Sequence, residues 1–401
     1  MHDVIVVGAR CAGSPVAMLL ARRGLGVLLL DRDTFPSDQP MSTHFVHPRG
    51  VACLARWGLR DRLVATGAPP VTRSELDFGT VTLAGEAPPT DGESAGFAPR
   101  RVLLDDILVR AAVANGAELR EGIAVDGLEF DAGRVSGVRG TTAAGVRFSE
   151  SARLVIGADG PASRVASAVR AQEYQQRPAL QGTAWIYWEG RAVDGLELHQ
   201  RDFEAVYAFP TSGSATLVGA NWSMDRFRAA RARIEPSYFE VLARAAPRLS
   251  DKLAGARRAE ERIHLGSTRN FFRKAHGPGW VLLGDAHYKK DPCTAQGITD
   301  AFCDAETLAE AVASGLGGSS DLDTGLAEHE QACVTRAMPF YEFTCQLATF
   351  APPPPELRAL LAALPGNATE IGRFIGLITE ATSPADFFSP ESVQRILQAR
   401  A

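Results

Sequence analysis

The sequence predicts an α/β protein in which a Rossmann-like βαβ domain carries an inserted antiparallel β-sheet domain and is followed by C-terminal helices. Three observations support this fold class. A βαβ pattern with a glycine-rich turn fills residues 4–31, and short alternating strands fill residues 175–275. Three separated apolar strands also end in a turn that carries an acidic residue. At 401 residues and 45% hydrophobic content, the chain can bury two or three cores.

Composition excludes several classes of partner. The net charge is −5 without any block of like charge, so the chain lacks the basic stripe that nucleic acid or an anionic membrane surface would require. No apolar run is long enough to predict a membrane span. The first residues lack the basic lead of a secretory signal, and six scattered cysteines include no C-x-x-C pair. We therefore expect a cytoplasmic protein with reduced thiols and no metal site.

The first unit is a strand, a tight turn, a helix and a second strand. The turn is Gly8-Ala9-Arg10-Cys11-Ala12-Gly13, and the second strand closes at Asp31, eighteen residues beyond Gly13. Free N–H groups at the start of the helix, together with its dipole, favour a pyrophosphate, and the acidic residue is placed for a ribose hydroxyl. Arg10 replaces the second glycine of G-x-G-x-x-G and could instead reach the phosphates or a nicotinamide donor. The other interpretation is a βα turn that binds nothing.

Residues 42–174 are predicted to contain a mixed succession of elements. In chain order these are a loop followed by two short helices over 42–66, broken at Gly58, short β runs over 70–99, a helix from Arg101 to Gly116, a hairpin over 123–138, and a buried strand over 153–156 that ends at Asp159-Gly160.

Residues 175–275 change to short alternating runs, which predict an antiparallel sheet interrupted by a helix over 236–246. Trp185 and Tyr187 fall on one strand face, with Trp188 on the other. A buried strand over 280–283 ends at Asp285 and precedes an amphipathic helix over 298–312. From Ser314, a Gly/Ser linker leads into further helical pieces.

Asp31, Asp159 and Asp285 each follow a buried strand. Ligands of open α/β sheets bind at the carboxyl ends of the strands, so we expect these three ends to converge on one extended cofactor.

With these motifs, residues 3 to 345 resemble the class A FAD-dependent monooxygenases, the p-hydroxybenzoate-hydroxylase-like family. Its superfamily also includes flavin-dependent halogenases and geranylgeranyl reductases. Four stretches carry the resemblance: Gly8–Gly13 as the FAD fingerprint, Arg101–Asp105 as the R-x-x-L-[DH] helix start, Asp159-Gly160 with Ser163 as the D-G motif, and Gly284-Asp285 with Pro292 and Ala295-Gln296-Gly297-Ile298 as the G-D motif.

The resemblance implies bound FAD, NAD(P)H as reductant, O2, and a small-molecule substrate, in a monomer or homodimer. It implies hydroxylation or epoxidation of an aromatic or polyketide-like molecule through a flavin C4a-hydroperoxide. The helix N-terminus at Gln296 would face the flavin N1/O2 edge and stabilise its negative charge. The residues expected to contact FAD are Gly8, Ala12, Gly13, Asp31, Arg32, Arg101, Val125, Asp159, Gly160, Asp285, Pro292, Gly297 and Ile298. Those expected to contact substrate are Trp185, Tyr187, His47 and Tyr207.

The implied organisation divides the chain into an FAD-binding domain, a substrate domain and a C-terminal helical region. The segments are 1–69, 100–174 and 276–320 for FAD, 70–99 and 175–275 for substrate, and 321–401 for the helices. His44 and His47 lie in a segment that approaches the flavin in the family. One of His287, Tyr288, Lys289 and Lys290 could contact substrate or act as an acid/base group, and the other interpretation of the two lysines, which we favour, is as solvated loop charges. No catalytic residue is assigned.

Departures from the family pattern leave other functions open. The arginine expected three residues after Ser163 falls at Ala166, with Arg164 as the nearest substitute, and His287 comes one residue early in the G-D motif. The alternatives are a flavin-dependent reductase of isoprenoid double bonds, a halogenase, and a non-catalytic FAD-binding sensor or assembly protein. Against a halogenase, Trp185-Ile186-Tyr187-Trp188 lacks the trailing Ile-Pro of that group, and no halogenase lysine segment follows the first βαβ unit.

Overall fold

The computed structural model describes residues 1–190 and 192–398. Its first sheet has eight strands in the order β16-β17-β8-β1-β2-β5, with β7 and then β6 attached through β8. Strands β1, β2, β5, β8 and β17 pair in parallel, which confirms the Rossmann-like prediction. The bounds are β1 His2–Val7, β2 Val27–Leu30, β5 Glu118–Arg120, β6 Ile123–Asp131, β7 Arg134–Thr142, β8 Arg147–Gly157, β16 His276–Gly277 and β17 Trp280–Leu282.

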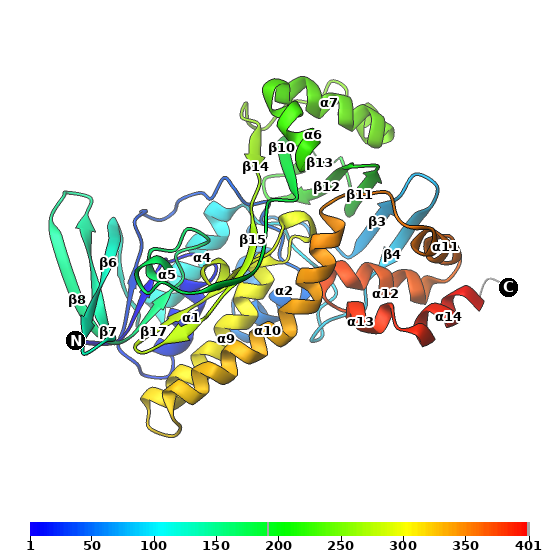
Figure 1. The fold of residues 1–401 in the computed structure, drawn as a ribbon. Coiled ribbons are helices and arrows are strands. Elements are labelled where there is room, and N and C mark those ends of the chain that lie inside the picture. The colour runs from blue at the N-terminus through cyan, green and yellow to red at the C-terminus, as the bar shows by residue number, and fades with distance from the viewer. Residues whose placement is uncertain (191, 399–401) are drawn as a thin grey trace.

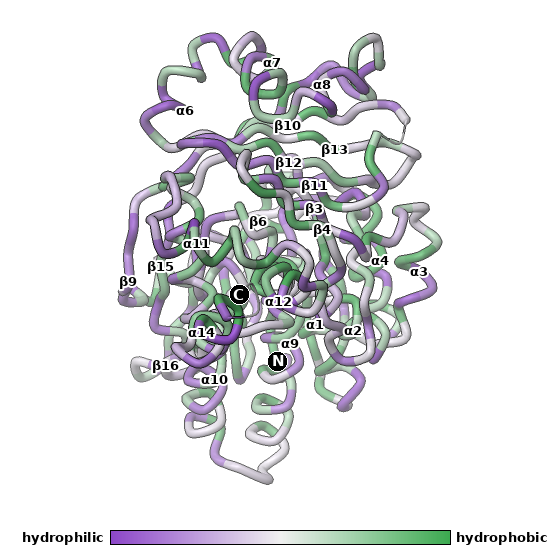
Figure 2. Tube along the Cα trace, turned by 90° about the vertical axis from the view of Figure 1, so that its right-hand side faces the viewer, coloured by the Kyte–Doolittle hydropathy of each residue, from purple (hydrophilic) through white to green (hydrophobic). Residues whose placement is uncertain are grey.

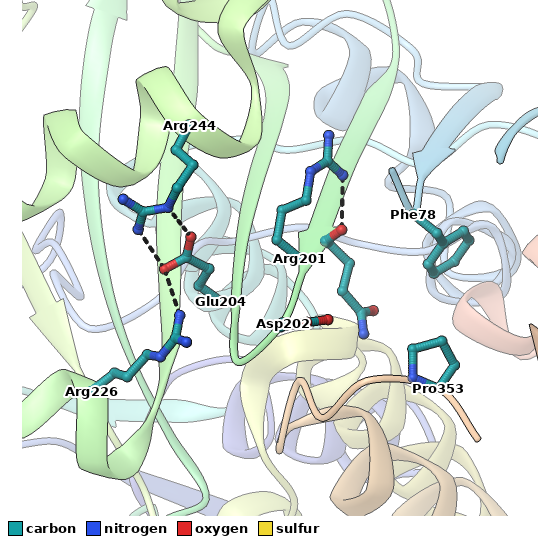
Figure 3. A pocket seen from close by; sticks show the side chains of 8 residues that line it. Phe78, Arg201, Asp202, Glu204, Arg226, Arg244 and Pro353 are labelled. Atoms are coloured by element: carbon teal, nitrogen blue, oxygen red, sulfur yellow. Dashed lines mark hydrogen bonds and ion pairs between the residues drawn. The ribbon is translucent and has the colours of Figure 1, made fainter. Parts of the chain in front are cut away.

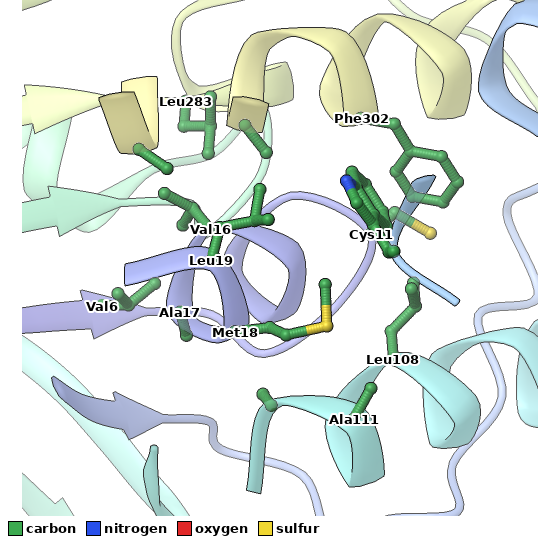
Figure 4. Packing of buried hydrophobic residues seen from close by; sticks show 14 of the residues in the cluster. Val6, Cys11, Val16, Ala17, Met18, Leu19, Leu108, Ala111, Leu283 and Phe302 are labelled. Carbon is green, nitrogen blue, oxygen red and sulfur yellow. The ribbon is translucent and has the colours of Figure 1, made fainter. Parts of the chain in front are cut away.

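Helices α1 (Gly13–Ala21), α4 (Arg101–Ala114) and α9 (Gly297–Leu316) cover one face of this sheet. Figure 4 shows α1 between α9 and α4, with Met18, Leu108 and Phe302 in the space between the helices. Helix α10 (Leu322–Leu347) runs beside α9, and the pair extends away from the sheet (Figure 1). The smaller helices of this part are α2 Pro48–Arg56, α3 Arg60–Val64 and α5 Arg164–Ala168.

The second sheet has seven strands in the order β14-β10-β13-β12-β11-β3-β4, antiparallel except for the β11–β3 pair. Strands β10, β12 and β13 lie within the range 175–275 that was predicted to form an antiparallel sheet, so that prediction is confirmed. The bounds are β3 Arg73–Asp77, β4 Thr82–Glu86, β10 Gln181–Glu189, β11 Leu196–Arg201, β12 Glu204–Thr211, β13 Ala215–Ser223 and β14 His264–Gly266.

Three helices cover the outer face of the second sheet. The predicted helix over 236–246 is α7 (Ile234–Ala245), and α6 (Met224–Ala230) and α8 (Pro247–Leu253) flank it. Figure 2 shows these helices above the strands, which follow in order from β10 down to β4. Trp188 packs into this outer layer, whereas Trp185 and Tyr187 face the other way, as predicted.

The C-terminal helices pack against β3 and β4 through a separate apolar cluster that includes Leu76, Leu83 and Phe374. A three-stranded sheet in the order β18-β15-β9 lies near α10. The remaining bounds are α11 Pro355–Ala363, α12 Ala368–Thr379, α13 Pro384–Phe387, α14 Pro390–Gln398, β9 Glu173–Arg177, β15 Asn270–Arg273 and β18 Tyr288–Lys289. Across the described residues, helices that combine the length and apolar character of a membrane span are absent.

Candidate active site

The glycine-rich turn is fixed by close backbone contacts. Gly8 has a φ of +100°, and a Cβ there would lie 2.5 Å from the carbonyl oxygen of Ala158. A Cβ on Gly13 would lie 1.7 Å from the carbonyl oxygen of Gly8. Both positions therefore require glycine. The N-cap of α1 is Ala12, which offers no side-chain cap, so N–H groups at this helix start stay available for an anion.

Asp31 holds this turn in place. Its carboxylate accepts hydrogen bonds from the backbone N–H of Ala9 at 2.7 Å and of Asp33 at 2.9 Å, and the residue is 7% exposed. Burial raises the pKa of this carboxyl group. Arg32 is exposed beside it. The N–H of Ile123 donates to the Asp31 carbonyl at 2.8 Å, so the start of β6, which carries Val125, lies beside the expected ribose position.

Arg10 is engaged by the protein itself, where we expected it to be able to reach the phosphates or a nicotinamide. Its guanidinium donates to Asp105 at 2.6 Å, to Asp33 at 2.8 Å and to Ser37 at 2.9 Å. Arg101 donates to both oxygens of the same buried Asp105 at 2.9 Å. Arg10 therefore ties the turn to α4 and to the segment after β2, while Arg101 holds the shared Asp105 carboxylate within α4.

The D-G motif forms the second part of the site. Asp159 accepts from the backbone N–H of Arg164 at 2.6 Å, and Ser163 caps α5. The other carboxylate oxygen of Asp159 is buried without a partner. Gly160 has a φ of +80°. A buried acceptor without a partner destabilises the folded state. A hydroxyl of a bound cofactor would therefore donate the hydrogen bond that this Asp159 oxygen lacks.

The G-D motif closes the site from the third side. A Cβ on Gly284 would lie 2.9 Å from the Cβ of Ala12, so this turn abuts the phosphate turn. Asp285 keeps its side chain 32% exposed and accepts from Lys289 at 2.6 Å. Gly297 is exposed, and the nearest atom to a Cβ there is an Asp285 oxygen at 3.9 Å. The three strand ends thus converge, and the space around Gly297 at the start of α9 is open.

The Pro292 loop (residues 290–296) is held from several directions. The ring Nε2 of His47 lies 2.9 Å from the carbonyl oxygen of Thr294, within hydrogen-bond distance. The backbone N–H of His47 donates to the Thr299 hydroxyl at 3.1 Å. Burial lowers the pKa of His47 to about 4, so the ring is neutral at pH 7. These contacts place His47 with this loop and with Thr299 of α9, and its ring lies 4.9 Å from that of Phe45.

Lys290 is buried, which corrects the expectation of a solvated loop charge. Its amine lies 2.9 Å from Asp300 at the start of α9 and 3.2 Å from Glu380, just after α12. Gln296, the N-cap of α9, also donates to the carbonyl of Ile378 at 3.0 Å. The end of α12 therefore braces the helix start that faces the expected flavin position.

An aromatic wall, defined by Trp185, Tyr187, Tyr207 and Phe209, covers the inner face of the second sheet. It packs against Phe45 and against Ala295 of the Pro292 loop. The Tyr187 hydroxyl lies 2.8 Å from a ring nitrogen of His44. The structure thus brings together the three predicted substrate residues of the sheet beside the start of α9.

Sequence reasoning missed a polar group at the edge of this wall. The Nε2 of His264 lies 3.0 Å from Glu260, and Glu260 also binds Arg100. The Arg100 guanidinium lies 3.9 Å above the Tyr187 ring, and the His264 ring stacks on Trp185. In the sequence, residues 260–264 show no alternating strand pattern. The four-residue spacing of Glu260 and His264 is therefore the one signal that could have indicated their interaction.

A cavity of about 380 Å³ opens elsewhere, between the β11–β12 turn, α6, α7 and Pro353 (Figure 3). Its buried Glu204 accepts from Arg244 and Arg226, and Arg201 binds Asp77. Because these guanidinium groups are paired within the protein, we take the converging strand ends of the first sheet, and not this cavity, as the candidate active site.

Residues 1–344 match the family described as FAD binding domain. The chain therefore belongs to this family, and it is an FAD-dependent oxidoreductase of the superfamily that contains monooxygenases and halogenases. The residues gathered at the three strand ends fit this cofactor.

The chain is similar to several proteins of that superfamily. It is 27% identical to a tryptophan 2-halogenase of Chondromyces crocatus, over 82% of this chain and 64% of the relative, so it spans less than two thirds of that protein. It is 27% identical to a rifampicin monooxygenase of Streptomyces venezuelae, over 91% of this chain and 75% of the relative. The solved structure of the flavin-dependent brominase Bmp2 shares the fold, with a TM-score of 0.81 and 17% identity over 99% of this chain and 98% of that chain.

Proposed function

We propose that the protein is an FAD monooxygenase that uses NAD(P)H and O2 to hydroxylate or epoxidise an aromatic or polyketide-like small molecule. The observation that carries the proposal is the contact between the aromatic wall and Ala295 of the Pro292 loop. A planar apolar substrate against this wall would lie next to the flavin ring. Similarity to a rifampicin monooxygenase over 91% of the chain supports the same reaction class.

The protein's own groups would bind, orient and shelter the reactants. Asp285 and the first N–H groups of α9 would hold the ribityl chain and the negatively charged edge of the reduced ring. Bound FAD, once reduced, supplies the oxygen-activating chemistry. The buried wall, with Trp185 and Tyr187 at 1% and 3% exposure, would exclude water from the reacting atoms.

Halogenation is the second candidate, because a tryptophan 2-halogenase matches 82% of the chain. Two sequence features weigh against it. Residues 32–100 contain no lysine, and the run from Trp185 to Trp188 is followed by Glu189-Gly190. A reductase and a non-catalytic FAD protein remain as the other outcomes of the test.

The test is oxygen uptake by the FAD-loaded protein with NADH or NADPH across a panel of phenols and aromatic polyketides, with and without bromide. We expect one substrate to stimulate uptake and to gain one oxygen atom independently of halide. A product that contains bromine would identify a halogenase. Anaerobic saturation of an isoprenoid double bond would identify a reductase. A yellow protein that is never reoxidised by O2 would identify the non-catalytic alternative.

A further inference from the structure

We propose that His264, oriented by Glu260, is a catalytic base that binds and deprotonates a hydroxyl group on the aromatic substrate. This inference rests on the proposed monooxygenase function and adds the group that would recognise the substrate. It also predicts that the substrate carries a hydroxyl group on the side of its ring that lies next to β14, the strand of His264.

The His264 ring is held on three sides. Its Nε2 lies 3.0 Å from an oxygen of Glu260, and Glu260 is itself held by the guanidinium of Arg100. The ring stacks on Trp185 with centroids 5.3 Å apart and planes 12° apart, and it meets Tyr187 edge-on at 5.5 Å. A base held in this way keeps one orientation while the proton moves.

Two polar atoms of this cluster lack partners. The Nδ1 of His264 and the Nε1 of Trp185 are both buried without a hydrogen bond, and the two residues are 4% and 1% exposed. When Nε2–H donates to Glu260, the Nδ1 of His264 becomes an acceptor, whereas the indole N–H is always a donor. A substrate hydroxyl that donates its hydrogen to Nδ1 of His264 would satisfy this buried acceptor.

The proton balance is simple. The O–H bond of the substrate breaks, and an N–H bond forms at Nδ1 of His264, while the Glu260 carboxylate stabilises the resulting imidazolium. The substrate oxyanion donates electron density to its ring and makes the ring carbon a better nucleophile. After oxygen transfer, the proton returns from Nδ1 to the product oxyanion. Electrons come from NAD(P)H, and the oxygen atom comes from O2.

A covering segment lies at this edge of the sheet. Residues 38–43 have no helix or strand, and Met41 is 56% exposed. A Cβ on Gly266, two residues after His264, would lie 3.5 Å from the Met41 side chain. Asp38 lies 3.5 Å from Arg100. Movement of this segment would open a path from solvent to the His264 ring.

The experiment uses the FAD-loaded, oxidised protein and two matched probes, 2-naphthol and 2-methylnaphthalene, without NAD(P)H. Binding is followed by the change in flavin absorbance, and ionisation by the red-shifted band of naphtholate, over a range of pH. The charged and titratable neighbours of His264 that would affect this titration are Glu260, Arg100, Asp38, His44 and Tyr187. The variants are His264→Gln and Glu260→Gln, with His276→Gln as a control, because His276 also pairs with a glutamate but lies at β16.

We expect the unmodified protein to bind 2-naphthol as naphtholate and at least roughly tenfold more tightly than 2-methylnaphthalene. His264→Gln should lose the naphtholate band, Glu260→Gln should form it only at higher pH, and His276→Gln should keep it. Equal affinity for the two probes, no binding of 2-naphthol, or a naphtholate band that persists in His264→Gln would overturn the assignment. Because no turnover is involved, failure of oxygen activation would be seen separately, as a protein that forms the band but does not consume O2.

Discussion

Replacing Asp291 with Asn should stabilise the protein, and by more at high pH. Asp291 lies at the start of the Pro292 turn, where one carboxylate oxygen accepts from Gln181 at 2.7 Å and from the N–H of Cys293 at 3.1 Å. The other oxygen is buried without a partner. Burial raises the pKa of this carboxyl group from 3.8 to about 6.

The sign of the effect follows from this raised pKa. The folded state favours the protonated form of Asp291. The stability that the protonated carboxyl group contributes is therefore complete below the unfolded pKa of 3.8, and it is lost as the pH rises through about 6. At about 1.36 kcal/mol per unit of pH, the ionised group costs about 3 kcal/mol at pH 8 and about 1 kcal/mol at pH 4.5. Asn keeps the accepting oxygen and removes the charge.

The assay is denaturant unfolding of the FAD-saturated protein at pH 4.5 and pH 8, with Asp225→Asn as a matched control on a carboxylate that is 94% exposed. Asp291→Asn should gain about 2 kcal/mol more in unfolding free energy at pH 8 than at pH 4.5, and Asp225→Asn should show no such difference. A loss of stability in Asp291→Asn that is the same at both pH values would refute the reasoning.

Three further predictions concern the site. Gly297→Val should keep the unfolding midpoint of the apoprotein, because open space surrounds a Cβ there, but should raise the Kd for FAD at least tenfold in a fluorescence titration; an unchanged Kd would remove the flavin from this position. Lys290→Met should lower the unfolding free energy by about 3–5 kcal/mol, because it leaves the buried Glu380 carboxylate without its ion-pair partner and leaves Asp300 only its pair with Arg336, and adding Glu380→Gln should recover part of the loss in the same denaturation; equal stability of the single and double variants would contradict the pairing. Arg10→Gly should lower the unfolding free energy by about 1–3 kcal/mol, because Asp105 and Asp33 lose a charged donor, and should not tighten FAD in a titration; tighter binding would show that the arginine obstructs the phosphates.

Local patterns were sufficient for most of the fold. The βαβ unit and the three acid-ended strands were predictable because each is set within about thirty residues by apolar runs and turn chemistry. The inserted sheet was predictable from the side chains of β10, β12 and β13, which point alternately to the inner and the outer face of the sheet. Both of these faces are buried. The convergence of Asp31, Asp159 and Asp285 followed from the rule for strand ends in parallel sheets.

Long-range pairing could not be read from the sequence. Arg10 binds Asp105, which is 95 residues away, and Lys290 binds Glu380, which is 90 residues away. A charged residue in a loop is exposed in most proteins, so the burial of Lys290 depends on partners that only the folded chain supplies. His264 was missed for the same reason, since its position beside Trp185 is created by the pairing of β14 with β10.

Whether one FAD spans the slot from the phosphate turn to α9 is tested most directly by a crystal structure of the protein grown with FAD. We predict a single FAD per chain, with its pyrophosphate at the start of α1 and the pyrimidine edge of its ring within hydrogen-bond distance of the N–H groups at Gly297 and Ile298. Crystals that stay colourless, or an FAD whose ring lies away from the start of α9, would contradict this placement.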